Sequence, residues 1–260
     1  MAFDMEKFNL LISKSEFDFK FLYFDSIGST NDYAKTHTLD DESKTTVIIS
    51  SSQTNGRGRI RREFISEKDK GIYFSIVKHG LKNCQIDMLT VAAAVCVCEA
   101  IEEECDVRLS IKWVNDILLD DKKICGILTE NVFDNKTKNI DLSIIGIGIN
   151  LFGKVDEKIQ NIASSIEALT NKKISAENVV FNTVCGLERF FLNQNKEDVI
   201  NKYRERCITV GRDVLVNDFT TTYQAKAIEV DDDGSLVVEF NEKKLHINSG
   251  EVSVLPLKSK

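Results

Sequence analysis

The chain changes character at Cys207, and this change most constrains its fold. After that residue the sequence runs through short segments rich in β-branched residues, with DDDG as a hairpin turn between two of them. These roughly fifty residues show no helical periodicity. We therefore expect residues 208–260 to form a small β-barrel that is appended to a mixed body of helices and strands in residues 1–207.

The body alternates between strand and helix patterns. Helical spacing of apolar residues predicts a long helix over Ile86–Cys105 and a second helical stretch over about Ala176–Cys207. Ser29 or Thr30 can cap a shorter helix that starts near Asn31. This mixture is typical of an α+β fold. Runs rich in β-branched and aromatic residues predict strands at 19–24, 45–53 and 71–78, and in VRLSIKW, NDILLDDKKICGILTENVF and IDLSIIGIGINL.

Charge and composition exclude several classes of function. The 260 residues carry a formal net charge of −7, which argues against a protein that coats nucleic acid or an anionic membrane. There is no apolar run of about 18 residues, and the N-terminal segment does not resemble a signal peptide, so we expect a cytoplasmic protein. The seven cysteines are expected to be reduced and mostly buried. The three histidines are not clustered with cysteines, so no zinc site is expected.

The segment QTNGRGRIRREF, residues 53–64, holds two glycines and four arginines, and we name it the arginine loop. Its spacing does not match a dinucleotide-binding motif, because the third glycine would fall at Arg61, and it lacks the Gly-Lys-Ser/Thr of a P-loop. Glycine lets the backbone approach a ligand closely, and arginine offers a fork of donors for carboxylate or phosphate. The loop therefore suits either a small bound anion or solvent.

Three further features lie between residues 112 and 148. The segment KWVND, 112–116, holds the only tryptophan at an expected strand end, where Asn-Asp also suits a turn. Lys123 opens an otherwise apolar strand, although a lysine beside a turn is usually exposed. Gly146 and Gly148 lie two apart on a strand, so they face one side and indicate either the approach of a ligand or close packing.

Five elements follow one another in order: GSTND (28–32), QTNGRGR (53–59), KWVND (112–116), KKICGILTE (122–130) and GIGIN (146–150). Together they resemble the biotin protein ligases, also called biotin–[carboxyl-carrier-protein] ligases. The β-rich tail resembles the small SH3-like C-terminal domain of that family. The resemblance implies an α+β catalytic core that is related to class II aminoacyl-tRNA synthetases and shared by biotin and lipoate ligases.

The resemblance also implies a reaction in two steps. Biotin and MgATP would give biotinyl-5′-AMP and pyrophosphate, and a lysine of a biotin carboxyl carrier domain would then attack this mixed anhydride and release AMP. The implied small molecules are ATP, Mg²⁺ and biotin. The implied partner is the carrier domain of a biotin-dependent carboxylase, with no nucleic acid and no membrane. The sequence leaves open whether two copies form a homodimer.

The same resemblance assigns candidate roles to single residues. Biotin's carboxylate and the α-phosphate of ATP repel each other, so cations are needed to hold them in line. The implied catalytic residues are Lys123, Arg57, Arg59 and Asp116. The implied biotin-binding residues are Ser29, Thr30, Asn31, Gln53, Gly56, Arg57, Gly58, Arg59, Lys123, Gly126, Gly146 and Gly148. The implied ATP- or adenylate-binding residues are Arg59, Lys112, Trp113, Asn115, Asp116 and Asn150.

Two expectations complete this assignment. No side-chain cluster suits a metal, so Mg²⁺ would arrive with ATP, and Asp116 is the candidate to help hold it. The arginine loop is expected to close over biotin and the adenylate, which would shield the anhydride from water.

The sequence departs from the family pattern at three positions. Val114 stands where the family usually has proline, and Arg61 and Phe64 stand where it has glycine and tryptophan. Fewer than thirty residues precede GSTND, which predicts a ligase without the N-terminal helix-turn-helix of some bacterial members. The alternatives are a lipoate or octanoate ligase or transferase of the same fold, a nucleic-acid-binding module that uses the arginine loop, and a relative that binds without catalysis.

Overall fold

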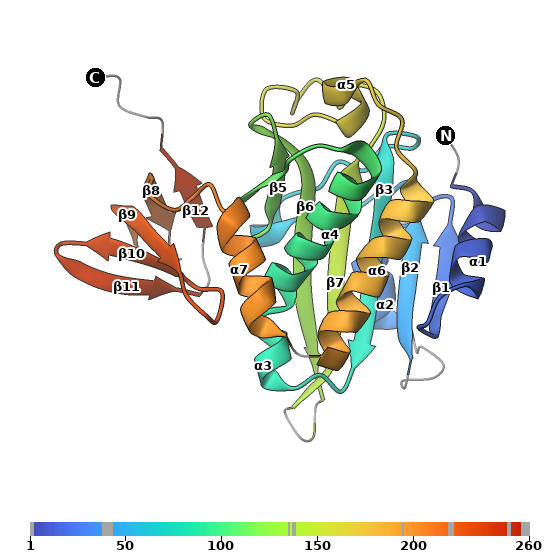
Figure 1. Cartoon of the computed structure of the whole chain (residues 1–260), viewed down its shortest axis with the longest axis horizontal. Helices are drawn as coiled ribbons and strands as arrows, with labels where there is room; N and C mark the ends of the chain where they lie inside the picture. Colours follow the sequence, from blue (N-terminus) through green and yellow to red (C-terminus); the bar gives the residue numbers. More distant parts are fainter. Residues whose placement is uncertain are drawn as a thin grey trace.

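The computed structural model describes residues 3–37, 44–134, 136, 139–193, 195–217, 221–248 and 251–255. A seven-stranded sheet with helices on both faces forms the body, and a five-stranded sheet lies at the C-terminal end (Figure 1). This mixed architecture confirms the expected α+β class.

The large sheet is built from strands β1 (Phe19–Phe24), β2 (Thr45–Ser50), β3 (Gly71–His79), β4 (Ser110–Lys112), β5 (Asp116–Leu119), β6 (Lys122–Phe133) and β7 (Ile140–Asn150). Their order across the sheet is β1-β2-β3-β7-β6-β5-β4. Strands β1 and β2 are parallel, and the other neighbours are antiparallel. The central strands β3 and β7 are almost entirely buried, as their long apolar runs predict. The strand expected over 45–53 ends at Ser50.

The helices cover the two faces of this sheet unequally. The long helices lie on one face, where α4 and α6 pack side by side, and α2 lies on the other face against β3 and β7 (Figure 1). The face that the long helices cover therefore holds the main hydrophobic core. On the other face, a small second core surrounds Ala34 of α2. The helices are α1 (Met5–Ser13), α2 (Thr30–Thr36), α3 (Asn83–Ile86), α4 (Leu89–Cys105), α5 (Ile166–Thr170), α6 (Ala176–Asn193) and α7 (Lys196–Arg206).

Of the two long helices expected from the sequence, one starts three residues later than expected and the other is interrupted. The helix expected over Ile86–Cys105 is α4, which starts at Leu89 with Met88 at its N-cap, and Ile86 is the last residue of the separate helix α3. The stretch expected over Ala176–Cys207 is α6 followed by α7. The side chain of Asn195 accepts a hydrogen bond from the backbone N–H of Asp198 and so starts α7 as a new helix. Helix α1 is missing from the prediction, although Phe8 is fully buried and Met5, Leu11 and Ile12 pack against the main core.

The C-terminal strands form an antiparallel sheet of their own. Its strands are β8 (Asp213–Asn217), β9 (Thr222–Val230), β10 (Leu236–Phe240), β11 (Lys243–Ile247) and β12 (Glu251–Val254), in the order β11-β10-β9-β8-β12. The DDDG turn joins β9 to β10, and Gly234 has a φ of 85°, which favours glycine. This sheet confirms the expected β-rich C-terminal unit, and the domain boundary at residues 207 and 208 stays a prediction.

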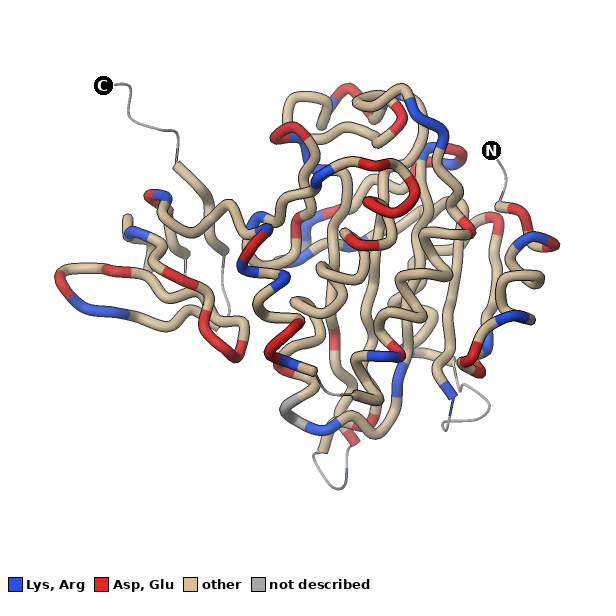
Figure 2. The backbone as a smooth tube through the Cα atoms, viewed as in Figure 1, with Lys and Arg blue, Asp and Glu red and all other residues tan. Residues whose placement is uncertain are grey.

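Charged and apolar residues are well separated. Lys, Arg, Asp and Glu lie mainly on loops, turns and helix surfaces, while the middle of the large sheet is nearly free of them (Figure 2). No helix in the described ranges is long and apolar enough to cross a membrane. The described cysteine side chains are free and mostly buried, as expected, and burial raises the pKa of Cys96 to about 12.

Candidate active site

A cavity of about 600 Å³ lies between the arginine loop and the large sheet. Each predicted site residue lines this cavity, with the exception of Gly56. The wall also includes Ile159, Asn161, Ile162 and Ala163, and Val252 of the C-terminal sheet. Among the described lining residues, five are cations and three are carboxylates, in a chain that is acidic overall: Arg57, Arg59, Arg62, Lys112, Lys123, Glu63, Asp116 and Asp121.

The arginine loop forms a hairpin over this cavity. At its base the backbone N–H of Gln53 donates to the carbonyl of Ser66 at 3.0 Å. A Cβ at Gly56 would lie 2.4 Å from the carbonyl oxygen of Phe64, so Gly56 lets the two sides of the hairpin meet. It supports the loop and does not face the cavity. Near the tip, Ile60 has a φ of 54°, which is an uncommon conformation for a β-branched residue.

Uncharged polar side chains form one end of the cavity. The side-chain oxygen of Gln53 accepts hydrogen bonds from the backbone N–H and the hydroxyl of Thr30, at 2.9 and 3.2 Å. The hydroxyl of Ser75 lies 2.7 Å from that of Thr30 and 2.6 Å from Oδ1 of Asn31. Ser29 caps α2 beside them. This end can therefore exchange hydrogen bonds with an uncharged polar ligand group.

Three glycines leave bare backbone on the sheet side of the cavity. Gly126 of β6 is paired with Gly148 of β7, and the ring of Phe64 lies over both. A Cβ at Gly148 would come within 2.5 Å of that ring, and a Cβ at Gly146 would come within 2.3 Å of Oδ1 of Asn31. Of the two interpretations of Gly146 and Gly148, close packing applies in the structure, and the groups packed there are themselves candidate site residues.

A second group of side chains in the cavity wall is charged, and we call it the charged end. Nζ of Lys123 lies 2.6 Å from Oδ1 of Asp116, and both side chains are partly exposed to the cavity. Nη1 of Arg59 donates to Oδ1 of Asn115 at 3.2 Å, and Nδ2 of Asn115 donates to the backbone carbonyl of Ile127 at 2.8 Å. This end offers two cations to an anionic ligand, while Asn115 is oriented by the sheet.

Trp113 joins this end to the C-terminal part of the chain. Its indole N–H donates to the carbonyl of Gly234 at 3.0 Å, and its backbone N–H donates to the hydroxyl of Thr209 at 2.9 Å. The next residue, Val114, follows a cis peptide bond, and its carbonyl accepts a hydrogen bond from the hydroxyl of Tyr203 at 3.0 Å. The KWVND turn is therefore held by surrounding elements without the proline of the family pattern.

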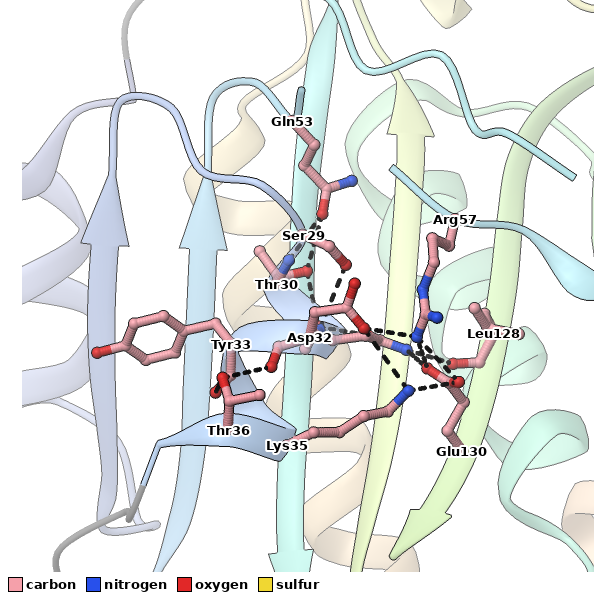
Figure 3. Close-up of polar contacts among 12 residues, drawn as sticks. Ser29, Thr30, Asp32, Tyr33, Lys35, Thr36, Gln53, Arg57, Leu128 and Glu130 are labelled. Carbon is pink, nitrogen blue, oxygen red and sulfur yellow. Dashed lines mark hydrogen bonds and ion pairs between the residues drawn. The ribbon is translucent and has the colours of Figure 1, made fainter. Parts of the chain in front are cut away.

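Arg57 belongs to a polar network between α2 and β6 (Figure 3). Its Nη2 lies 2.6 Å from Oδ1 of Asp32 and 3.2 Å from Oε1 of Glu130. Lys35 reaches the same Oε1 at 2.6 Å, and Nδ2 of Asn31 donates to Oε2 of Glu130 at 2.8 Å. Arg57 was expected to face an anionic ligand, but in this structure its guanidinium contacts two carboxylates of the protein.

These contacts keep Glu130 ionised. Burial alone would raise its pKa, but hydrogen bonds from Lys35 and Asn31, together with the charges of Lys35 and Arg57, outweigh burial and leave the pKa below its usual value. The resulting stabilisation is present at neutral pH and is lost as the pH falls through the lowered pKa.

Several cavity and network residues are absent from the predicted site. Asp32 and Glu130 lie inside the GSTND and KKICGILTE elements, but their pairing joins segments far apart in sequence. Lys35 follows Asp32 by three residues on α2, and this spacing is the one signal that could have indicated it. Nothing in the sequence places Val252 at the cavity, because that depends on how the C-terminal sheet docks.

Gly146→Ala should destabilise the protein. The added Cβ would overlap Asn31, whose amide is fixed by hydrogen bonds from Ser75 and to Glu130. Overpacking of this kind costs about 1–3 kcal/mol, which urea denaturation would measure. Gly28→Ala is the matched control, since a Cβ there meets nothing within 4 Å. Equal stability of the two variants would contradict the packing described here.

Known proteins are similar to this chain in sequence and in fold. The family model named Biotin/lipoate A/B protein ligase family matches residues 23–150. The bifunctional ligase/repressor BirA of Bacillus subtilis is 28% identical over 241 residues, which cover 90% of this chain and 73% of that protein. The biotin–[acetyl-CoA-carboxylase] ligase of Paracoccus denitrificans is 23% identical over 214 residues, which cover 79% of this chain and 88% of that protein.

A solved structure extends the similarity to nearly the whole chain. The biotin protein ligase from Aquifex aeolicus in complex with biotin and ATP matches with a TM-score of 0.74 and 25% identity, over 91% of this chain and 98% of that one. Residues 23–150 of this chain match the biotin/lipoate A/B protein ligase family, and nearly the whole chain shares the fold of a solved biotin protein ligase. The relatives named above are biotin protein ligases or are bifunctional with a ligase activity.

Proposed function

We propose that this chain is an ATP-dependent biotin protein ligase, which forms biotinyl-5′-AMP and transfers biotin to a lysine of a biotin carboxyl carrier domain. The observation that carries the proposal is the division of the cavity. One part of its wall offers uncharged hydrogen-bonding groups, around Thr30 and Gln53, and another part offers cations, around Lys123 and Arg59. Biotin has the same two parts, since a polar ring system and a carboxylate are joined by an aliphatic chain.

The first step joins two anions. The biotin carboxylate attacks the α-phosphate of ATP, an acyl–phosphate bond forms, and pyrophosphate leaves. Lys123 is placed to neutralise both reacting groups, because its ammonium lies at the cavity wall and is oriented by Asp116. Arg59 and Asn115 lie on the side where the nucleotide would sit. No side-chain nucleophile is required, since the anhydride itself is the activated species.

Magnesium enters as part of the MgATP substrate in this proposal. The described residues contain no group of three or more His, Cys, Asp or Glu side chains that could hold a metal ion. Asp116 is a carboxylate at the charged end, and its contact with Lys123 leaves one of its oxygens to other partners. The residues present therefore fit a metal that is held mainly by the phosphates.

In the second step the amine of a carrier lysine attacks the acyl carbon, an amide bond forms and AMP leaves. The acceptor in this proposal is a biotin carboxyl carrier domain of a carboxylase, and the name of the Paracoccus denitrificans relative gives acetyl-CoA carboxylase as the target of that protein. The arginine loop covers the cavity and limits the access of water to the anhydride until the carrier arrives. A cytoplasmic location, and a division into a ligase domain at 1–207 and an SH3-like domain at 208–260, belong to the same proposal.

The complete reaction can be tested with purified components. We expect the chain, with MgATP and biotin, to add one biotin to a biotin carboxyl carrier domain, as intact-mass spectrometry would show. A carrier whose acceptor lysine is replaced by arginine should stay unmodified. A lipoyl domain with MgATP and lipoate serves as the second control. Modification of the lipoyl domain in place of the biotin carrier would overturn the assignment to biotin.

A further inference from the structure

Two cations and two carboxylates share the same atoms beneath the arginine loop (Figure 3). Oδ1 of Asp32 lies 2.6 Å from Arg57 and 3.7 Å from Lys35. Oε1 of Glu130 lies 3.2 Å from Arg57 and 2.6 Å from Lys35. Arg57 belongs to the loop, whereas Asp32, Lys35 and Glu130 belong to α2 and β6. The two cations therefore compete for the same pair of oxygens.

Because Arg57 and Lys35 share these oxygens, the arginine loop can move away from α2 and β6 at a lower cost. When Arg57 departs, Asp32 and Glu130 keep Lys35 as a partner, and Glu130 also keeps its hydrogen bond from Asn31. No carboxylate is left without a cation in the open state. The four side chains are between a quarter and two fifths exposed, so each ion pair is moderate in strength and is screened by salt.

The same network reaches the uncharged end of the cavity. Nδ2 of Asn31 donates to Glu130, and Oδ1 of Asn31 accepts from the hydroxyl of Ser75. The hydroxyl oxygen of Thr30 lies 2.7 Å from that of Ser75. A continuous chain of hydrogen bonds thus links the base of the loop's anchor to the candidate biotin-binding groups. A ligand that moves Thr30 or Asn31 would therefore alter the hydrogen bond that Glu130 accepts from Asn31.

We propose that Asp32, Lys35 and Glu130 are positioning residues that act together as a latch for the arginine loop. Asp32 and Glu130 hold the loop closed through Arg57, and Lys35 weakens this hold by competing with Arg57. The latch sets the fraction of time for which the loop is open. This role deepens the proposed ligase function and rests on it, because an open loop would let the acyl-adenylate escape.

Because the carboxylates and Lys35 have opposite roles, their variants should change the rate of loop cleavage in opposite directions. Trypsin cleavage within residues 57–62 of the ligand-free protein, followed by mass spectrometry, reports the open fraction when closing is faster than cleavage. Asp32→Asn and Glu130→Gln should each raise the cleavage rate about two- to fivefold, the range for a partly exposed ion pair. Lys35→Gln should lower the rate by a similar factor, because Arg57 then has no competitor.

Asp198→Asn is the matched control. Asp198 lies in the first turn of α7 and pairs with Lys202, just as Asp32 lies in the first turn of α2 and pairs with Lys35. It should leave the cleavage rate unchanged. Added salt should speed cleavage of the wild type and have a smaller effect on Asp32→Asn. Acceleration by all three latch variants would mean simple loss of stability and would overturn the proposal, as would no change in any of them.

Release of the acyl-adenylate separates this inference from the proposed function. In the absence of carrier, Asp32→Asn and Glu130→Gln should release more acyl-adenylate than the wild type, and Lys35→Gln should release less. Cleavage rates that follow the expected signs, in a protein that makes no acyl-adenylate, would leave the latch standing and overturn the ligase assignment. If the wild type makes acyl-adenylate but the latch variants do not change the cleavage rate, the ligase assignment stands and the latch is overturned.

Discussion

Lys123→Ala should lower the rate of acyl-adenylate formation by roughly 100- to 1,000-fold, the range for loss of one preorganised charge-stabilising group. The ammonium of Lys123 is the cation that lies nearest Asp116 at the charged end of the cavity, where the carboxylate and the α-phosphate are expected to meet. Its removal also leaves Asp116 without this partner, which adds repulsion toward both anions. Pyrophosphate release with biotin and MgATP would measure the effect.

Lys122→Ala is the control that the chain itself offers. Lys122 precedes Lys123, but its ammonium is exposed and binds the backbone carbonyls of Gln160 and Asn161. We expect pyrophosphate release close to that of the wild type for this variant. A Lys123→Ala protein with wild-type pyrophosphate release would show that the reacting groups meet elsewhere in the cavity.

Arg57→Ala should release biotinyl-AMP into solution about tenfold faster and lower the yield of biotinylated carrier. The change removes two partly exposed ion pairs, each worth up to about 1 kcal/mol, that hold the arginine loop over the cavity. Escaped anhydride is then hydrolysed by water before a carrier lysine can attack it. Quantifying free biotinyl-AMP by mass spectrometry, with and without carrier, would measure both effects.

Arg189→Ala provides the comparison for that variant. Arg189 also pairs with a carboxylate, Glu16, at 3.3 Å, but both side chains are exposed and lie on the helical side of the molecule. Its loss should change neither release nor transfer. Equal release by Arg57→Ala and the wild type would contradict the role of Arg57 in holding the loop closed.

The short elements GSTND, QTNGRGR, KWVND, KKICGILTE and GIGIN predicted most of the cavity wall. Their residues have distinctive chemistry, and the strands that carry them are apolar enough to be recognised. Gly56 is the exception, because a glycine in such an element can serve either a ligand or the closing of the hairpin. Only the geometry around Phe64 decides between these roles.

The ion pairs could not be predicted in the same way. Arg57 and Glu130 are separated by 73 residues, and their meeting depends on the order of α2, β6 and the loop around the sheet. Without that order, Arg57 looks like a cation that is available to a ligand. The break before α7 was missed for a related reason, because it depends on the cap that the side chain of Asn195 provides to the backbone N–H of Asp198.

The central claim is that the cavity activates biotin as an adenylate. The most direct test is to incubate the purified chain with MgATP and either biotin or lipoate, without any carrier, and to detect the acyl-adenylate by mass spectrometry. We predict biotinyl-AMP with biotin and no lipoyl-AMP with lipoate. Lipoyl-AMP alone would assign the chain to the lipoate branch of its family, and the absence of either adenylate would contradict the ligase account.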